Sequence, residues 1–126
     1  MGFFARLLGK KEQADPPTDS NEQAVLIYLD GTSLPQEVYD EYDVATLEDR
    51  LTDAISNQSL GEYDGDEFGP EGVTLFMYGP DGQRLFAGIE SVVRSYPLCQ
   101  NARVIIRTGP PGAPETEIAI FSILRE

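Results

Sequence analysis

The alternation of short β-like segments with two amphipathic segments is the feature that most restricts the fold of this chain. Segments bounded by turn residues and containing apolar, β-branched or aromatic residues are typical of β-strands, and they span residues 24–29, 60–63, 73–78, 102–107 and 115–121. Residues 46–57 and 80–96 instead repeat their apolar residues at helical spacing. The resulting order, β-α-β-β-α-β-β, predicts an α+β fold. We expect a ferredoxin-like sandwich whose antiparallel sheet carries both helices on one face.

The residues that border the two amphipathic segments support this interpretation as helices. Thr46 can cap the first amides of one helix, and Asp49 would lie near the positive end of its dipole. Gly61 marks the end of that helix. Pro80 suits the first turn of the other helix, and Pro97 ends it.

Two polar segments between these elements are predicted to be loops. Residues 31–45 contain Pro35 and an acidic stretch, which favour a loop with some extended structure. Residues 64–72 are acidic and rich in glycine. They are predicted to form the turn of a hairpin that joins two strands.

The chain divides into three predicted parts. Residues 12–23 have the composition of a linker, and residues 24–126 form a single α+β domain. Residues 1–11 form a short amphipathic segment whose apolar face comprises Phe3, Phe4, Leu7 and Leu8. This segment could pack on its own domain, dock on a partner or contact an anionic membrane weakly. Because no apolar run approaches the ~20 residues of a membrane span, a cytoplasmic location is expected.

The absence of histidine excludes more chemistry than any other feature of the composition. It removes Ser-His and Cys-His nucleophiles, histidine proton shuttles and most transition-metal sites. The one cysteine, Cys99, cannot form an intramolecular disulfide and is predicted to be a small core residue. We therefore expect a protein that is not an enzyme and has no cofactor or metal.

Five carboxylates fall within ten residues, between Glu62 and Glu71. Such a group could bind Ca²⁺ or Mg²⁺, but an EF-hand loop would need oxygen ligands where Phe68 and Leu75 stand. A solvated hairpin turn is the simpler interpretation. A glycine-rich turn at residues 79–82 is likewise interpreted as a helix start rather than a phosphate site, because Asp81 would repel phosphate.

The net charge of −13 restricts the partners that this chain can bind. Such a charge repels nucleic-acid phosphates, so a basic protein surface is the expected partner and nucleic acid is not. Tyrosines beside carboxylates are typical of protein interfaces. The predicted interaction surface comprises Tyr39, Asp40, Glu41, Tyr42, Asp43, Asp64, Asp66 and Glu67.

Residues 61–86, 95–98 and 107–112 resemble a group of short bacterial proteins that share a DG-x-E-x-G, TLY-x-YGPD and LF pattern. The resemblance implies a bacterial cytoplasmic protein, and it implies no site residues. The acidic ferredoxin-like plan is also loosely similar to the ribonuclease E inhibitor family, whose members act by binding an enzyme.

The predicted function is therefore a non-catalytic protein-binding or regulatory domain of the inhibitor or immunity type. A negative potential would speed the capture of a basic target. One alternative is a peripheral membrane adaptor that acts through residues 1–11. Another is an enzyme that depends on carboxylates or a metal.

Overall fold

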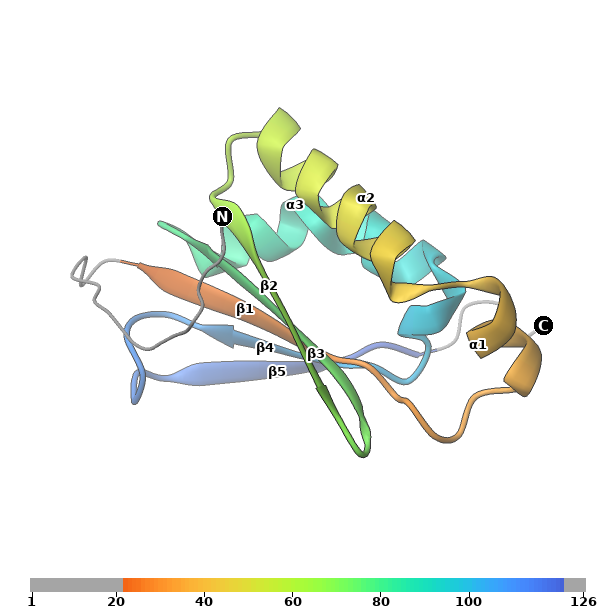
Figure 1. Cartoon of the computed structure of the whole chain (residues 1–126). Coiled ribbons are helices and arrows are strands. Elements are labelled where there is room, and N and C mark those ends of the chain that lie inside the picture. Colours follow the sequence, from red (N-terminus) through yellow and green to blue (C-terminus); the bar gives the residue numbers. More distant parts are fainter. Residues whose placement is uncertain (1–21, 122–126) are drawn as a thin grey trace.

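The computed structural model describes residues 22–121, which form a five-stranded antiparallel sheet and three α-helices (Figure 1). The strand order is β2-β3-β1-β4-β5, and the strands are β1 (Gln23–Tyr28), β2 (Glu62–Gly69), β3 (Gly72–Gly79), β4 (Arg103–Arg107) and β5 (Glu115–Ala119). Every neighbouring pair is antiparallel. The predicted α+β class and antiparallel sheet are confirmed. With β5 outside β4, the strand order differs from that of a simple ferredoxin fold.

The two long helices lie side by side on one face of the sheet (Figure 1). The helical elements are α1 (Gln36–Glu41), α2 (Val44–Asn57), α3 (Gly82–Ser95) and a 3₁₀ turn, η1 (Pro97–Cys99). The apolar residues predicted for each long helix form its buried face, because helical spacing places them on one side. These residues are Leu47, Leu51 and Ile55 on α2, and Leu85, Phe86, Ile89 and Val93 on α3.

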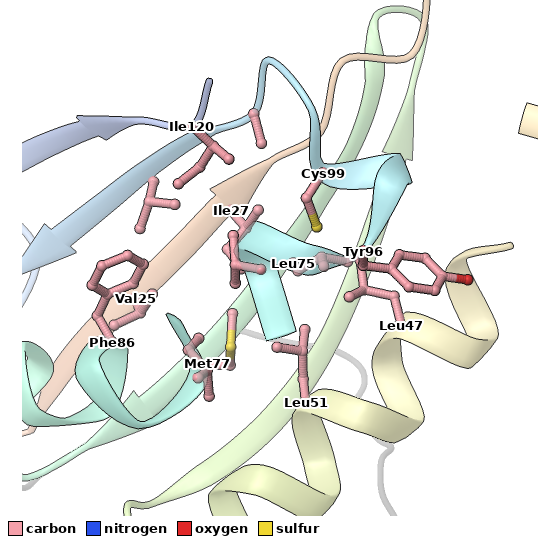
Figure 2. Close-up of a cluster of buried hydrophobic side chains, with 14 of the residues drawn as sticks. Val25, Ile27, Leu47, Leu51, Leu75, Met77, Phe86, Tyr96, Cys99 and Ile120 are labelled. Carbon is pink, nitrogen blue, oxygen red and sulfur yellow. The ribbon is translucent and has the colours of Figure 1, made fainter. Parts of the chain in front are cut away.

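The hydrophobic core fills the space between these helices and the sheet (Figure 2). Alternate strand residues point into it, because side chains of a strand project to opposite faces in turn. Val25, Ile27, Leu75 and Met77 are fully buried there. Cys99 is also buried in the core, as expected, and burial raises the pKa of its thiol to about 12. This cysteine is therefore a packing residue with a protonated thiol.

The prediction of a loop over residues 31–45 is wrong, because the segment contains α1 and the start of α2. Helix α2 is capped by Asp43, whose carboxylate accepts a hydrogen bond from the Thr46 amide at 2.9 Å. The predicted cap at Thr46 is three residues too late. The earlier start gives Val44 a helical position from which it packs against the core.

The prediction of a long acidic turn over residues 64–72 is also wrong. Strand β2 continues to Gly69, and the hairpin turn contains only Pro70 and Glu71. The register shifts once, at a bulge between Tyr63 and Gly65, and then runs without interruption. Pairing with the strongly apolar β3 therefore overrides the low strand propensity of Asp and Gly.

Several predicted segments lie outside the described residues. They are residues 1–11 with Phe3, Phe4, Leu7 and Leu8, the linker up to residue 21, and the end of the chain from residue 122. The last described strand, β5, ends at Ala119, two residues before the predicted end at Phe121.

Candidate functional site

One side of the molecule gathers carboxylates from a helix and an edge strand. Strand β2 is at the edge of the sheet, paired only with β3 in the described part of the chain, and α2 packs against it. We call this surface the acidic edge, and it comprises Glu48, Asp49 and Asp53 of α2 with Asp64 and Asp66 of β2. The predicted residues Asp64, Asp66 and Glu67 thus belong to a strand beside an acidic helix.

Glu48 and Asp66 interact within the acidic edge. The Tyr63 hydroxyl donates a hydrogen bond to Glu48 Oε2 at 2.7 Å. Burial, followed by hydrogen bonding and charge repulsion from Asp66, raises the pKa of Glu48 to about 7. Burial and the Glu48 carboxylate also raise the pKa of Tyr63, which stays protonated. Burial of Glu48, together with its interaction with Asp66, thus favours the protonated form of Glu48.

A cleft of about 470 Å³ opens where the β2–β3 hairpin passes the ends of β1 and β4. We call it the hairpin cleft, and its lining includes Tyr28, Asp30, Glu67, Phe68, Glu71 and Arg103. The strand register explains part of this lining. Glu67 pairs with Thr74, Thr74 with Tyr28, and Tyr28 with Arg103. These residues form one row on the face opposite the helices, because the adjacent Ile27 points into the core.

Two glycines allow the β2–β3 hairpin to lie close to the segment that follows β1, beside the hairpin cleft. The Gly31 amide donates to the Glu71 carbonyl at 3.1 Å, and the Leu29 amide donates to the Val73 carbonyl at 2.9 Å. Gly72 has a φ of 147°, and a Cβ atom there would lie 2.3 Å from the Leu29 carbonyl oxygen. Only glycine permits so close an approach of two backbones.

Asp30 forms one wall of the cleft, with its carboxylate already engaged. It accepts hydrogen bonds from the amides of Thr32 and Ser33, both at 3.0 Å, from the Ser33 hydroxyl, and from Asn101 Nδ2 at 3.3 Å. Although burial opposes ionisation, these hydrogen bonds lower the pKa of Asp30 to about 2. Asp30 is therefore a permanent negative charge and cannot exchange protons near neutral pH.

Arg103 also lines the cleft. Its guanidinium carbon lies 4.7 Å from the centre of the Tyr28 ring, and Nη1 lies 3.5 Å from Glu117 Oε2. Phe68 lies at the hairpin with 67% of its surface exposed. Sequence reasoning did not select Tyr28, Phe68 or Arg103 as site residues. The alternation of residues within each strand shows which of them share a face of the sheet. It does not show which strands lie next to each other.

The predicted tyrosines of residues 39–43 serve the internal packing of the domain. The Tyr39 hydroxyl donates to the Asp30 carbonyl at 2.8 Å and accepts a hydrogen bond from the Leu34 amide at 3.1 Å. Tyr42 packs edge-on against Tyr96, with ring centres 5.6 Å apart. Asp40 and Glu41 are exposed on α1. The predicted surface therefore divides among α1 with its junction to α2, the acidic edge, and Glu67 on the sheet face opposite the helices.

Within residues 22–121, no group of three acidic or cysteine side chains has the geometry to hold a metal ion. None of the helices in this range has the length and apolar content to cross a membrane. No family model, curated protein or solved structure matches the chain. The resemblance stated from the sequence thus stays a prediction.

Proposed function

We propose that this domain is a non-catalytic binding module whose acidic edge recognises a basic protein surface. The observation that carries the proposal is the packing of the acidic helix α2 against the acidic edge strand β2, which brings carboxylates of both elements together. Like charges held together disfavour the folded state, and a cationic partner would relieve that repulsion. The negative potential would also speed encounter with a basic target, which suits an inhibitor or immunity role.

The position of the acidic edge at the sheet border supports the proposal. An edge strand offers backbone groups to a partner, and acidic side chains on it disfavour pairing with a second acidic copy. The same charges accept a basic partner. The same acidic side chains therefore disfavour pairing with a second copy of this chain and favour binding of a basic partner.

We further propose that the architecture is a ferredoxin-like sandwich extended by one strand. The order β2-β3-β1-β4 with two long helices on one face supports this proposal, and β5 adds to the β4 edge.

The experiment compares two variants that each lose two negative charges. The test variant is Asp49→Asn with Asp53→Asn on the exposed face of α2, and the control is Glu90→Gln with Glu115→Gln on α3 and β5. Basic proteins purified from the source cell are titrated against full-length protein by calorimetry. We expect binding that weakens with salt and falls more in the test variant than in the control. Equal losses in the two variants, or no binding to any basic protein, would overturn the proposal.

A further inference from the structure

We propose that residues 1–11 dock, within the same molecule, on the face of the sheet opposite the two long helices. We call this face the open face. The inference goes beyond the proposed function and does not depend on it, because the acidic edge lies where α2 packs on β2 at the border of the sheet.

The centre of the open face is apolar. Neither long helix covers it (Figure 1). Leu26 of β1 pairs in the register with Phe76 of β3 on one side and with Ile105 of β4 on the other, so these three side chains form one row. Tyr28 and Tyr78 lie two positions along β1 and β3, and they project from the same face. None of the five belongs to the core cluster between the helices and the sheet.

This apolar centre has a packed floor and an accessible aromatic surface. Leu26 and Ile105 are only 9% and 8% exposed and form the floor. The rings of Tyr28, Phe76 and Tyr78 are partly exposed around it. A contiguous apolar surface bordered by polar residues is typical of an interaction site in a small domain.

Carboxylates border the apolar centre on both sides. The register places four of them on the open face, Glu62 and Glu67 of β2 and Glu115 and Glu117 of β5. Arg103 and Arg107 of β4 project from the same face. Arg103 is paired with Glu117, and Arg107 donates from Nε to the Gly109 carbonyl. The border is therefore negative overall, and it favours an occupant that is both apolar and basic.

Residues 1–11 have this chemistry. The segment contains three basic residues and no acidic residue, so all 22 acidic residues of the chain lie outside it. Its four large apolar residues recur at helical spacing, which predicts that they share one face. They are Phe3, Phe4, Leu7 and Leu8, and the basic residues are Arg6, Lys10 and Lys11. The segment thus complements both the apolar centre and the acidic border of the open face.

The connection to the domain brings the segment to this face. Strand β1 begins at Gln23 and is the middle strand of the sheet. The connecting residues, 12–22, can span at most about 36 Å, whereas five strands form a face about 20 Å wide. The whole open face is therefore within reach of the segment. Attachment through a short connection gives an effective concentration in the millimolar range, which favours the segment of the same molecule over that of a second copy.

The first test compares full-length protein with the Leu7→Ser, Leu8→Ser variant, which keeps the charge and leaves every described residue unchanged. Amide chemical shifts of both proteins are measured by NMR. We expect differences concentrated in residues 24–28, 74–78 and 103–107, with the same size at all protein concentrations. Differences confined to α2 and α3, or none in the described strands, would overturn the proposal. A dependence on protein concentration would assign the open face to a second copy and would also overturn it.

Trypsin cleavage after Lys10 and Lys11 provides a second readout, because proteolysis follows the population of the undocked segment. The Leu7→Ser, Leu8→Ser variant should be cleaved about tenfold faster than the wild type. Phe76→Ser, which removes a ring from the open face, should also speed cleavage. The matched control is Phe68→Ser, because Phe68 pairs with the core-facing Val73 and its exposed ring lies on the other face of the same hairpin. Equal cleavage of Phe76→Ser and Phe68→Ser would overturn the proposal.

Vesicles of anionic phospholipid distinguish docking from membrane attachment. We expect the open-face shift differences to be present without vesicles. If they are absent, and the wild type binds the vesicles whereas the Leu7→Ser, Leu8→Ser variant does not, residues 1–11 are a membrane contact and the docking proposal is wrong.

Discussion

At the residue scale, Glu48 connects the electrostatics of the acidic edge to the stability of the fold. Its pKa rises from the ordinary value of 4.5 to about 7 in the folded protein. A carboxyl group whose pKa is raised on folding favours the folded state as long as the group is protonated in both the folded and the unfolded protein. The contribution of Glu48 is therefore fully present below about pH 4.5 and is lost as the pH rises through about 7.

We predict that Glu48→Gln removes this pH dependence. The variant keeps an oxygen that accepts the Tyr63 hydrogen bond, and it has no charge to repel Asp66. Urea unfolding at pH 5, 6, 7 and 8 should show that the free energy of unfolding of the variant exceeds that of the wild type increasingly as the pH rises. Asp30 titrates far below this range and does not interfere. Parallel pH profiles of the two proteins would show that Glu48 titrates normally.

Two glycines of the β2–β3 hairpin differ in the space around them. Gly65 and Gly72 have similar backbone angles, with φ of 140° and 147°. A Cβ atom at Gly65 would meet nothing within 4 Å, whereas at Gly72 it would collide with the Leu29 carbonyl. We therefore expect Gly65→Ala to cost about 1–3 kcal/mol of backbone strain and Gly72→Ala to cost more. Chemical denaturation measures the free energy of unfolding of both variants. An equal loss in the two variants would mean that the hairpin can move away from β1 without destabilising the fold.

At the element scale, the two long helices and the central strands were predicted well, because their signals are local. The predicted helix over residues 80–96 is observed as α3, Gly82–Ser95, since its apolar face and flanking prolines lie within one segment. Strand β2 was not predicted beyond residue 63, because Asp64 to Gly69 have low strand propensity. They form a strand only because they pair with the apolar β3. The hairpin cleft was missed for the same reason: Tyr28 and Arg103 are neighbours only through the register of β1 and β4.

A side-chain cap stabilises the first turn of α3. Asp81 accepts a hydrogen bond from the Arg84 amide at 3.1 Å and caps the helix. Asp81→Ala should lower the free energy of unfolding by about 1 kcal/mol, and Asp81→Asn by less, because Asn is also a good cap. Thermal and urea unfolding of the two variants measure the difference. A change in Asp81→Asn as large as in Asp81→Ala would indicate that the charge, rather than the hydrogen bond, stabilises α3.

At the scale of the whole molecule, the charge of −13 opposes the compact state, and part of that repulsion acts within the acidic edge, where Asp66 and Asp49 repel Glu48. Salt screens exposed charges over about 8–10 Å at moderate ionic strength. We therefore predict that NaCl, raised from about 0.02 to about 0.2 M, increases the unfolding temperature of the free domain. The Asp49→Asn, Asp53→Asn variant should start at a higher unfolding temperature and respond less to salt than the Glu90→Gln, Glu115→Gln control. This outcome would mean that the acidic edge holds repulsion which the fold itself does not need and which a basic partner can relieve. An identical salt response in all three proteins would mean that the charge is spread evenly over the surface and serves solubility alone.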